Sequence, residues 1–192
     1  SSPYWMCVFA HAFGQRGYDP IIPLCGCDLT GCFEKPHGAR SYSYCARCEH
    51  AGTTLLNKFG LEPTPLASVL DSEIPSVDDE TINNLETYRS VPVGDLAMAS
   101  TRRSLARRRI NLENPDHRAI YRGYLDSALV LTDAAHTILD ENDVAATVAW
   151  DASYIYGGCF MHAANERGIP AYQCGSGYSN NTLMFGRADN VS

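Results

Sequence analysis

The clearest pattern of apolar positions begins after Asn114-Pro115. Apolar and small residues then recur every three to four positions, which is the spacing of one face of an α-helix. Asn is a favoured N-cap residue, and Pro is a favoured residue at the first helical position. The pattern therefore predicts a long amphipathic helix from Pro115 to about Glu141. Its recurring positions are Tyr121, Leu125, Ala128, Thr132, Ala135 and Leu139.

Two short apolar runs follow this helix, at residues 144–150 and 169–174, and each has the length of a buried strand. The residues between them, 157–167, have a helical pattern that ends at Gly168. A strand, a helix and a second strand in succession predict a βαβ unit with parallel strands and a right-handed connection. The predicted fold class is α/β, with a Rossmann-like parallel sheet flanked by helices and a Cys-rich metal-knuckle insertion.

The first half of the chain carries weaker signals. Glycines follow two helical patterns and mark their ends, at Gly17 and Gly60. One apolar run holds two prolines, which push a strand toward a sheet edge. Several prolines then interrupt the pattern, so we expect short helices there. The predicted elements are helices at 2–16, 45–59, 78–88 and 93–110 and a strand at 20–25.

The length of 192 residues, with 45% hydrophobic, allows one well-buried core but is short for two full domains. We predict a single Rossmann-like domain over residues 1–192. It contains the insertion at 25–50, a helical excursion at 61–112, and the long helix with the βαβ unit at 113–185. The chain starts with a helix N-cap pattern rather than with Met, so we expect an excerpt of a longer two-domain chain.

The net charge of −7 gives the molecule as a whole no electrostatic reason to bind nucleic acid specifically or to bind anionic lipid. No stretch approaches the roughly 20 apolar residues of a transmembrane helix, and the first residues lack a signal-peptide pattern. We therefore expect a cytoplasmic protein. Positive charge is concentrated in one segment, which could clamp phosphates or form a solvated face. Its arginines are Arg102, Arg103, Arg107, Arg108 and Arg109.

Four of the eight cysteines have the spacing of a metal site. Cys27 and Cys32 form one close pair, and Cys45 and Cys48 form the second after twelve intervening residues. Two such pairs supply the four thiolates that tetrahedral Zn²⁺ requires, and amides at a helix start favour thiolate in the second pair. An iron–sulfur cluster is a less favoured alternative, and reduced cysteines without metal are another.

A closed site of four thiolates leaves no open coordination position, so its expected role is structural. Further residues could replace a missing ligand, and the three other cysteines are expected to be small buried hydrophobic residues. The reserve ligands are Cys25, His37 and His50, and the buried thiols are Cys7, Cys159 and Cys174.

The loops after the two C-terminal strands are the candidate binding site, because ligands of open parallel sheets bind at the carboxyl ends of the strands. Residues 151–158 and 175–182 are polar and glycine-rich, and they could bind hydroxyls or a phosphate at a helix N-terminus. They could equally be ordinary polar loops. Neither has a dinucleotide fingerprint, a P-loop or a nucleophile elbow, which argues against an oxidoreductase, an NTPase and a serine hydrolase.

Several segments resemble, in the same order, the N-terminal half of bacterial and archaeal GT-B glycosyltransferases linked to capsule and surface-polysaccharide synthesis. The resemblance runs through most of the chain, and the cysteine set is its most specific part. The matching segments are 9–17, 24–28 with Cys32, 45–48, 100–105, 121–129, 167–170, 177–178 and 181–183. The strand expected before the first helix is absent, and the chain stops at 185–189, where a donor domain is expected.

The resemblance implies the acceptor-binding half of a glycosyltransferase, which moves a sugar from a nucleotide-sugar co-substrate to a glycan or lipid-linked acceptor. Its partner would be a C-terminal donor domain. Inverting transfer needs a base for the acceptor hydroxyl and groups that stabilise the leaving nucleotide. The expected base is Asp151, with His11 as the rival; the expected substrate contacts are Tyr154, Gly157, Gly158 and Ser176, with Arg102 and Arg103 on phosphate.

Two other functions are compatible with the same residues. One is a non-enzymatic, zinc-stabilised binding module that recognises an anionic partner through the arginine-rich segment. The other is a stand-alone binder of a nucleotide or a sugar phosphate.

Overall fold

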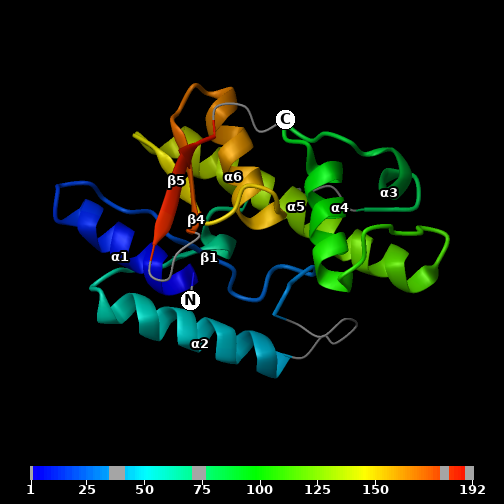
Figure 1. Ribbon diagram of the computed structural model, residues 1–192, viewed down its shortest axis with the longest axis horizontal. Helices are drawn as coiled ribbons and strands as arrows, with labels where there is room; N and C mark the ends of the chain where they lie inside the picture. The colour runs from blue at the N-terminus through cyan, green and yellow to red at the C-terminus, as the bar shows by residue number, and fades with distance from the viewer. Residues whose placement is uncertain (1, 35–41, 71–76, 178–181, 189–192) are drawn as a thin grey trace. The chain divides into compact units, whose positions relative to one another are not determined.

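The computed structural model describes residues 2–34, 42–70, 77–177 and 182–188 (Figure 1). It is a mixed α/β structure, about half helical, with one two-stranded and one three-stranded sheet among the described residues. The chain divides into two compact units, where the sequence predicts one domain. We call residues 1–28 and 34–69 the N-terminal unit, and residues 29–33 and 70–192 the C-terminal unit.

The N-terminal unit contains two longer helices and a short parallel pair of strands. Its small hydrophobic core is formed by Cys7, Leu56 and Leu61. The strand predicted at 20–25 shortens to two residues, because proline has no N–H to donate to a neighbouring strand. The elements are α1 (Ser2–Gly14), β1 (Pro23–Leu24), α2 (Tyr42–Lys58), β2 (Thr64–Pro65) and a 3₁₀ turn (Leu66–Ser68), with Pro23 opposite Thr64.

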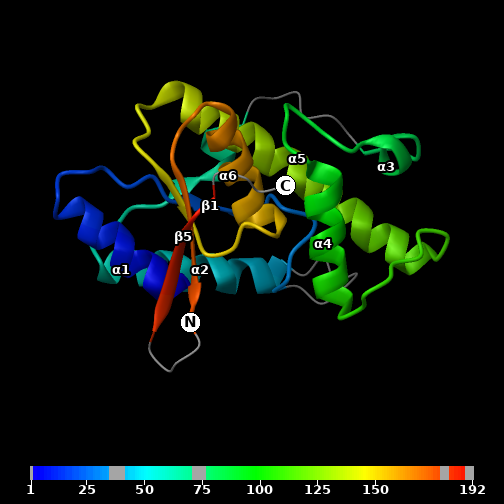
Figure 2. The same ribbon diagram turned by 45° about the horizontal axis from the view of Figure 1, so that its top comes forward.

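The C-terminal unit is built around α5 (Pro115–Glu141), which confirms the predicted helix. The Asn114 side chain accepts hydrogen bonds from the amides of Asp116 and His117, at 3.0 and 3.1 Å, and so caps the helix. Fourteen residues of α5 are buried. Two further helices, α4 (Val93–Leu105) and α6 (Ile155–Glu166), pack against it (Figure 2).

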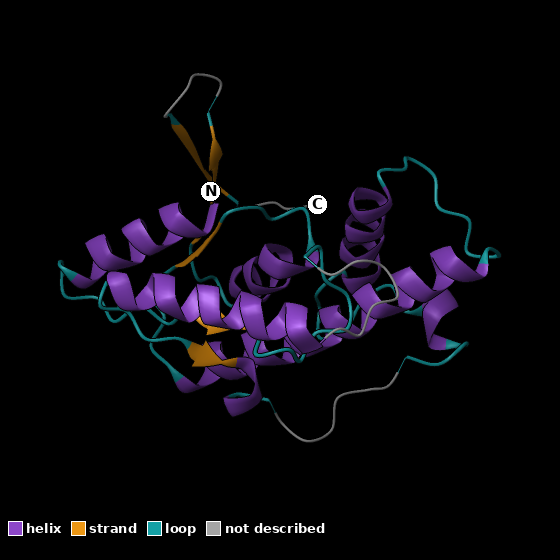
Figure 3. Ribbon diagram, turned by 90° about the horizontal axis from the view of Figure 1, so that it is seen from below, coloured by secondary structure: helices purple, strands orange, loops and turns teal. Residues whose placement is uncertain are grey.

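The sheet of the C-terminal unit contains β3 (Thr147–Ala149), β4 (Ala171–Ser176) and β5 (Leu183–Arg187). β3 and β4 are parallel and are joined through α6, which confirms the predicted βαβ unit. β5 runs antiparallel to β4 (Figure 3) and was not predicted. The loop expected at 175–182 therefore begins only after Ser176, because Ser176 belongs to β4 and pairs with Leu183. Residues 178–181 of that loop lie outside the described residues.

Three helices are shorter than predicted: α1 by two residues, and α3 and α4 by more. α4 ends at Leu105 because Ala106 adopts a left-handed backbone (φ 49°), and its amide bonds back to the carbonyl of Arg103. The last three arginines therefore follow the helix instead of extending it. The helix predicted at 78–88 shortens to α3 (Thr81–Asn84), because the chain then turns at Tyr88–Val91. None of the helices in the described ranges combines the length and apolar composition that crossing a bilayer requires.

Candidate functional site

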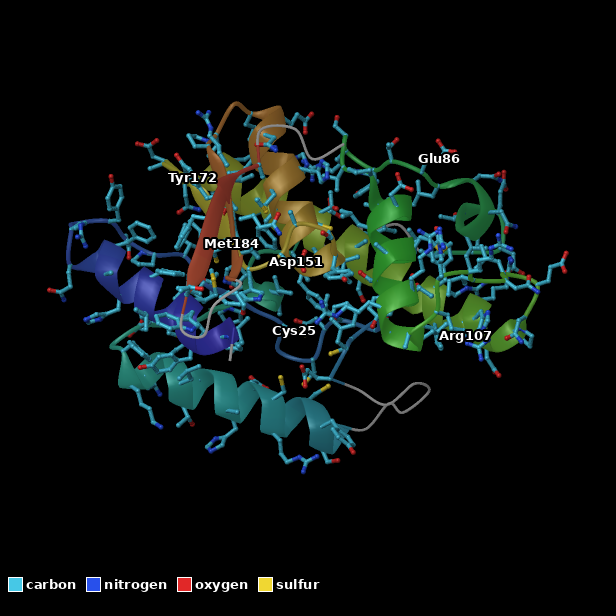
Figure 4. The ribbon with its side chains drawn as sticks, in the orientation of Figure 1. Cys25, Glu86, Arg107, Asp151, Tyr172 and Met184 are labelled. Atoms are coloured by element: carbon cyan, nitrogen blue, oxygen red, sulfur yellow. The ribbon has the colours of Figure 1, made fainter. Side chains whose placement is uncertain are left out.

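Asp151 lies directly beyond the carboxyl end of β3 and before α6 (Figure 4). One carboxylate oxygen, Oδ1, accepts a hydrogen bond of 2.8 Å from the amide of Ser153. The other, Oδ2, lies 4.0 Å from Nη1 of Arg103. The Asp151 side chain is 34% exposed. One oxygen is thus held by the turn, while the group as a whole stays within reach of a ligand.

Arg103 reaches this place from the last turn of α4. Its guanidinium carbon lies 4.8 Å from the ring centre of Phe33 and 4.6 Å from that of Tyr154. Both distances are within the range of a cation–π interaction. The two rings meet edge to face, with centres 5.6 Å apart. The structure therefore brings together Asp151, Tyr154 and Arg103, which the sequence predicted for one site from two separate segments.

The aromatic residues beneath Arg103 were not predicted as part of the site. Phe33 also contacts the rings of Tyr124 and Tyr156, at 5.4 and 5.3 Å. The Tyr156 hydroxyl donates to the carbonyl of Gly31 at 3.0 Å. Burial raises the pKa of Tyr156 far above its ordinary value, and burial also raises the pKa of Tyr124 to about 12. Both hydroxyls stay protonated. The buried rings form a rigid support for the charged pair of Arg103 and Asp151.

Gly157 and Gly158 are buried inside the first turn of α6. A Cβ atom on Gly157 would lie 2.0 Å from the carbonyl oxygen of Asp151, and one on Gly158 would lie 2.5 Å from Cδ2 of Leu96. Glycine is therefore needed for close packing of α6 against the Asp151 loop and α4. The two glycines position the loop, and their expected role as substrate contacts stays a prediction.

Ser176, at the end of β4, is exposed. It lies three residues beyond Gln173, which is paired with Ala149 of β3. Because β3 and β4 are parallel, both strands end at the same edge of the sheet. The register is compatible with a role for Ser176 at the ligand edge, which stays a prediction.

Three other arginines near the end of α4 have a different environment from Arg103. Arg102, Arg108 and Arg109 line an open recess of about 700 Å³. Within the described residues, no carboxylate oxygen lies within 4.0 Å of a nitrogen of these three side chains. Cations without a protein partner favour an anionic ligand. The two predicted phosphate contacts thus lie in different places. Arg102 lines the recess, and Arg103 lies beside Asp151.

His11, the rival base, belongs to the N-terminal unit. Its Nδ1 lies 2.8 Å from the carbonyl oxygen of Phe59. A carbonyl oxygen can only accept, so Nδ1 carries a proton, and a neutral ring then has its lone pair on Nε2. That atom could accept a proton, but the chemical role of His11 stays a prediction.

Two of the predicted metal ligands, Cys27 and Cys45, contact each other in the N-terminal unit. The thiol of Cys27 is hydrogen-bonded to Cys45, and desolvation, followed by this bond and by the nearby charges, raises the pKa of Cys27 to about 11. Cys27 itself has a left-handed backbone (φ 80°), next to Gly26 (φ 56°). The amide of Asp28 closes this turn by donating to the carbonyl of Cys25 at 3.0 Å. A metal ion would replace the proton on such a thiol.

The predicted zinc site stays a prediction. Cys45 and Cys48 lie in α2, as expected, while Cys32 belongs to the C-terminal unit. Among the described residues, no three metal-binding side chains are arranged to hold an ion. His37 lies outside the described residues, and His50 is exposed in α2. The structure confirms that the other three cysteines are buried: Cys7, Cys159 and Cys174.

The comparisons with known proteins identify no family for this chain. No family model matches it, and neither a curated protein nor a solved structure is significantly similar to it. The glycosyltransferase resemblance therefore stays an expectation drawn from the sequence.

Proposed function

We propose that the carboxyl end of β3 binds a hydroxyl-bearing acceptor and that the protein is the acceptor-binding part of a glycosyltransferase. The observation that supports this most is the convergence of Asp151, Arg103 and Tyr154. An amide fixes one oxygen of the Asp151 carboxylate, and a cation lies 4.0 Å from the other. Such a carboxylate is suited to orient a hydroxyl and accept its proton. The parallel βαβ unit supports the proposal that the sheet is Rossmann-like.

In the proposed reaction, Asp151 takes the proton of the acceptor hydroxyl as its oxygen bonds to the anomeric carbon of the donor sugar. The bond between that carbon and the phosphate oxygen breaks, and the nucleotide leaves with the electron pair. Cations are needed to stabilise the charge that develops on the leaving group. The arginines of the recess, Arg102, Arg108 and Arg109, could supply them. The donor domain implied by the resemblance is part of the proposal.

The test measures the release of nucleotide from a panel of nucleotide sugars by the purified full-length protein, with and without glycan acceptors. Asp151→Asn should lower turnover by about 10²–10⁴-fold with the fold preserved, because a positioned base contributes about that much. Asp143→Asn removes an exposed carboxylate just before β3 and serves as the matched control. Near-normal turnover in Asp151→Asn removes Asp151 from the role of base.

We also propose that Cys27, Cys32, Cys45 and Cys48 hold a structural Zn²⁺. The contact between Cys27 and Cys45 and the left-handed turn at Cys27 support a preformed half of the site. Elemental analysis of protein purified without chelators should find about one zinc per chain, and less than about a tenth of an equivalent of any metal contradicts the site. Iron in place of zinc would favour the iron–sulfur alternative.

The recess formed by Arg102, Arg108 and Arg109 favours a second candidate function, a non-enzymatic module that binds an anionic partner. Binding of polyphosphate should then weaken steeply with added salt, because each neutralised phosphate releases a counterion. The double variant Arg108→Gln, Arg109→Gln should reduce both the affinity and the salt dependence. The exposed Arg16 in α1 offers a control, Arg16→Gln. Such binding without any nucleotide-sugar turnover favours this module over the transferase.

A further inference from the structure

A second open cleft lies at the opposite end of α6 from Asp151. Its volume is about 530 Å³, within the range of small-molecule sites. α6 has 12 residues, so the two ends are separated by about 18 Å along the helix axis. The cleft therefore belongs to neither the Asp151 site nor the arginine recess. Its lining residues are Arg89, Ser90, His136, Glu166 and Arg167.

His136 presents an unused hydrogen-bond donor to this cleft. It is only 4% exposed, and its Nδ1 lies 2.8 Å from Nη2 of Arg167. A guanidinium can only donate, so Nδ1 accepts, and the neutral ring carries its proton on Nε2. Burial first, and then the charges of Arg89 and Arg167, lower the pKa of His136, which keeps the ring neutral. Nε2 is buried and has no hydrogen-bond partner among the described residues.

Arg167 fixes this arrangement by using four of its five N–H donors within the protein. Nε and Nη2 donate to Oδ1 of Asp140, at 3.0 and 2.7 Å. Nη1 donates to the carbonyl of Ala163 at 3.1 Å. Every nitrogen of the guanidinium is therefore engaged, and Arg167 is a positioning residue for His136.

Two other groups in the cleft keep free hydrogen-bonding capacity. The Glu166 carboxylate is 42% exposed, and its Oε2 lies 3.9 Å from Nε2 of His136, too far for a direct hydrogen bond. Arg89 donates through Nη1 to Asp133 at 2.9 Å, while its side chain stays 42% exposed. The cleft thus combines donors on His136 and Arg89 with an acceptor on Glu166.

The turn that carries Arg89 into the cleft has an unusual backbone. Arg89 and Ser90 both adopt left-handed conformations, with φ of 46° and 66°. Such two-residue turns normally use Asn or Gly, because a side chain is strained there. Two hydrogen bonds hold the turn closed: the amide of each of Tyr88 and Val91 donates to the carbonyl oxygen of the other, at 2.9 Å. Strained backbone of this kind gathers at ligand sites.

The charges of the cleft select the class of ligand. Arg89 is neutralised by Asp133, and Arg167 by Asp140, so among the described residues that line the cleft the Glu166 carboxylate is the charge that remains. A phosphate or carboxylate ligand would be repelled by Glu166. A hydroxyl group fits better, because its oxygen can accept from Nε2–H of His136 while its hydrogen is donated to Glu166. One such oxygen bridges the 3.9 Å gap.

We propose that this cleft is a second binding site, for a neutral sugar whose adjacent hydroxyls are held by His136, Glu166 and Arg89. It is separate from the Asp151 site and does not depend on the proposed transferase activity. A ligand of this class explains both the buried unpaired donor and the strained turn at the mouth of the cleft.

The experiment uses long-range ¹H–¹⁵N NMR spectra of the histidine rings in the full-length protein. The ligands are the methyl α-pyranosides of glucose, galactose and mannose, with inorganic phosphate titrated separately. We expect the free protein to show the Nε2–H form of His136, and at least one glycoside to shift its ring signals in a saturable way. Glu166→Gln should weaken that binding about tenfold or more, because it removes a charged acceptor.

Glu141→Gln changes the same charge at an exposed residue at the end of α5 and should leave the affinity unchanged. Asp151→Asn should also leave it unchanged, which separates this site from the proposed function. The proposal is overturned if no glycoside shifts His136, which would mean that water alone occupies the cleft. It is also overturned if phosphate binds more tightly than the glycosides, or if Glu166→Gln binds them like the wild type.

Discussion

The two units of this protein bury their hydrophobic residues on different scales. The N-terminal unit consists of segments of 28 and 36 residues around a core of Cys7, Leu56 and Leu61. In the C-terminal unit, α5 alone buries fourteen residues, ten of them hydrophobic. Below about 70–80 residues a hydrophobic core rarely gives enough stability, and small domains add metal ions or crosslinks. Packing therefore accounts for the C-terminal unit, whereas the small core of the N-terminal unit would be strengthened by the proposed metal ion.

The difference also separates the chemistry of the two units. Three of the four predicted metal ligands, Cys27, Cys45 and Cys48, are in the unit with the smaller core, where a metal ion would contribute to folding. The charged and aromatic groups that could act on a ligand are held by α4, α5 and α6 of the well-packed unit. A rigid scaffold keeps such groups in a fixed geometry. The two units should therefore respond differently to metal removal and to substitution.

The largest expected effect is that of metal removal. If zinc holds the N-terminal unit, chelation should increase amide hydrogen exchange in α1 and α2 by about 100-fold or more, since each tenfold change corresponds to about 1.4 kcal/mol. The amides of α5 should keep their protection. Hydrogen exchange read by mass spectrometry resolves both units in one sample. Equal acceleration in α5, or none in α2, would break the comparison.

Gly157→Ala should give the next largest effect, on the C-terminal unit. Its Cβ atom would meet the Asp151 carbonyl at 2.0 Å, so the first turn of α6 or the Asp151 loop must shift. We expect a loss of about 1–3 kcal/mol in the free energy of unfolding, measured by denaturant titration. Gly175→Ala is the control, because nothing lies within 4 Å of the added atom. Equal losses in both variants would show that the close approach is not what matters.

The helix cap of α5 predicts a smaller effect. Asn114→Ala removes the acceptor for the amides of Asp116 and His117 and should cost about 1 kcal/mol. Asn114→Asp keeps an acceptor at the cap and should stay close to the wild type. Thermal unfolding followed by circular dichroism measures both. An unchanged midpoint in Asn114→Ala would mean that packing alone determines where α5 begins.

The smallest effect concerns pH. Burial, followed by Arg89 and Arg167, lowers the pKa of His136 below its ordinary value, and burial lowers the pKa of His162 as well. In the unfolded chain these rings take up protons near pH 6.5, whereas in the folded protein they remain neutral. Stability should therefore be fully present above about pH 6.5 and should decrease as the pH falls below it.

Denaturant unfolding at pH 7.5 and pH 5.5 measures this loss. His136→Gln should make the difference between the two pH values smaller, and His162 should account for part of what remains. An unchanged difference in His136→Gln would contradict the assignment of a lowered pKa to this histidine.

The parts of the fold that the sequence predicts well are those with strong local signals. Asn114-Pro115 and the spacing of apolar residues placed α5 correctly, and the two apolar runs placed β3 and β4. β5 has mostly exposed residues and an internal glycine, Gly186, so its pairing comes from backbone hydrogen bonds that leave no pattern in the sequence. The end of α4 at Leu105 was also not predictable, because the next residue, Ala106, is an alanine, which favours helix.

The residues of the candidate site show the same contrast between those with a local signal in the sequence and those without one. Asp151 and Tyr154 were predicted from their place after a strand, and Arg103 from the density of positive charge. Phe33 was missed because it is separated from Arg103 by about 70 positions, and only the folded chain brings the ring under the guanidinium. Likewise, His136 resembles an ordinary residue within a helix until the unpaired Nε2 is seen.

The antiparallel direction of β5 determines how this sheet can be extended. β4 has a neighbour on each side, so a further strand could join only beside β3 or at the outer edge of β5. Another βαβ step needs a neighbour that runs in the same direction, and β3 offers it, whereas β5 runs opposite to β3 and β4. Growth of a doubly wound sheet would thus proceed past β3. Asp151 would then lie toward the middle of the ligand edge, and Ser176 would stay at its rim.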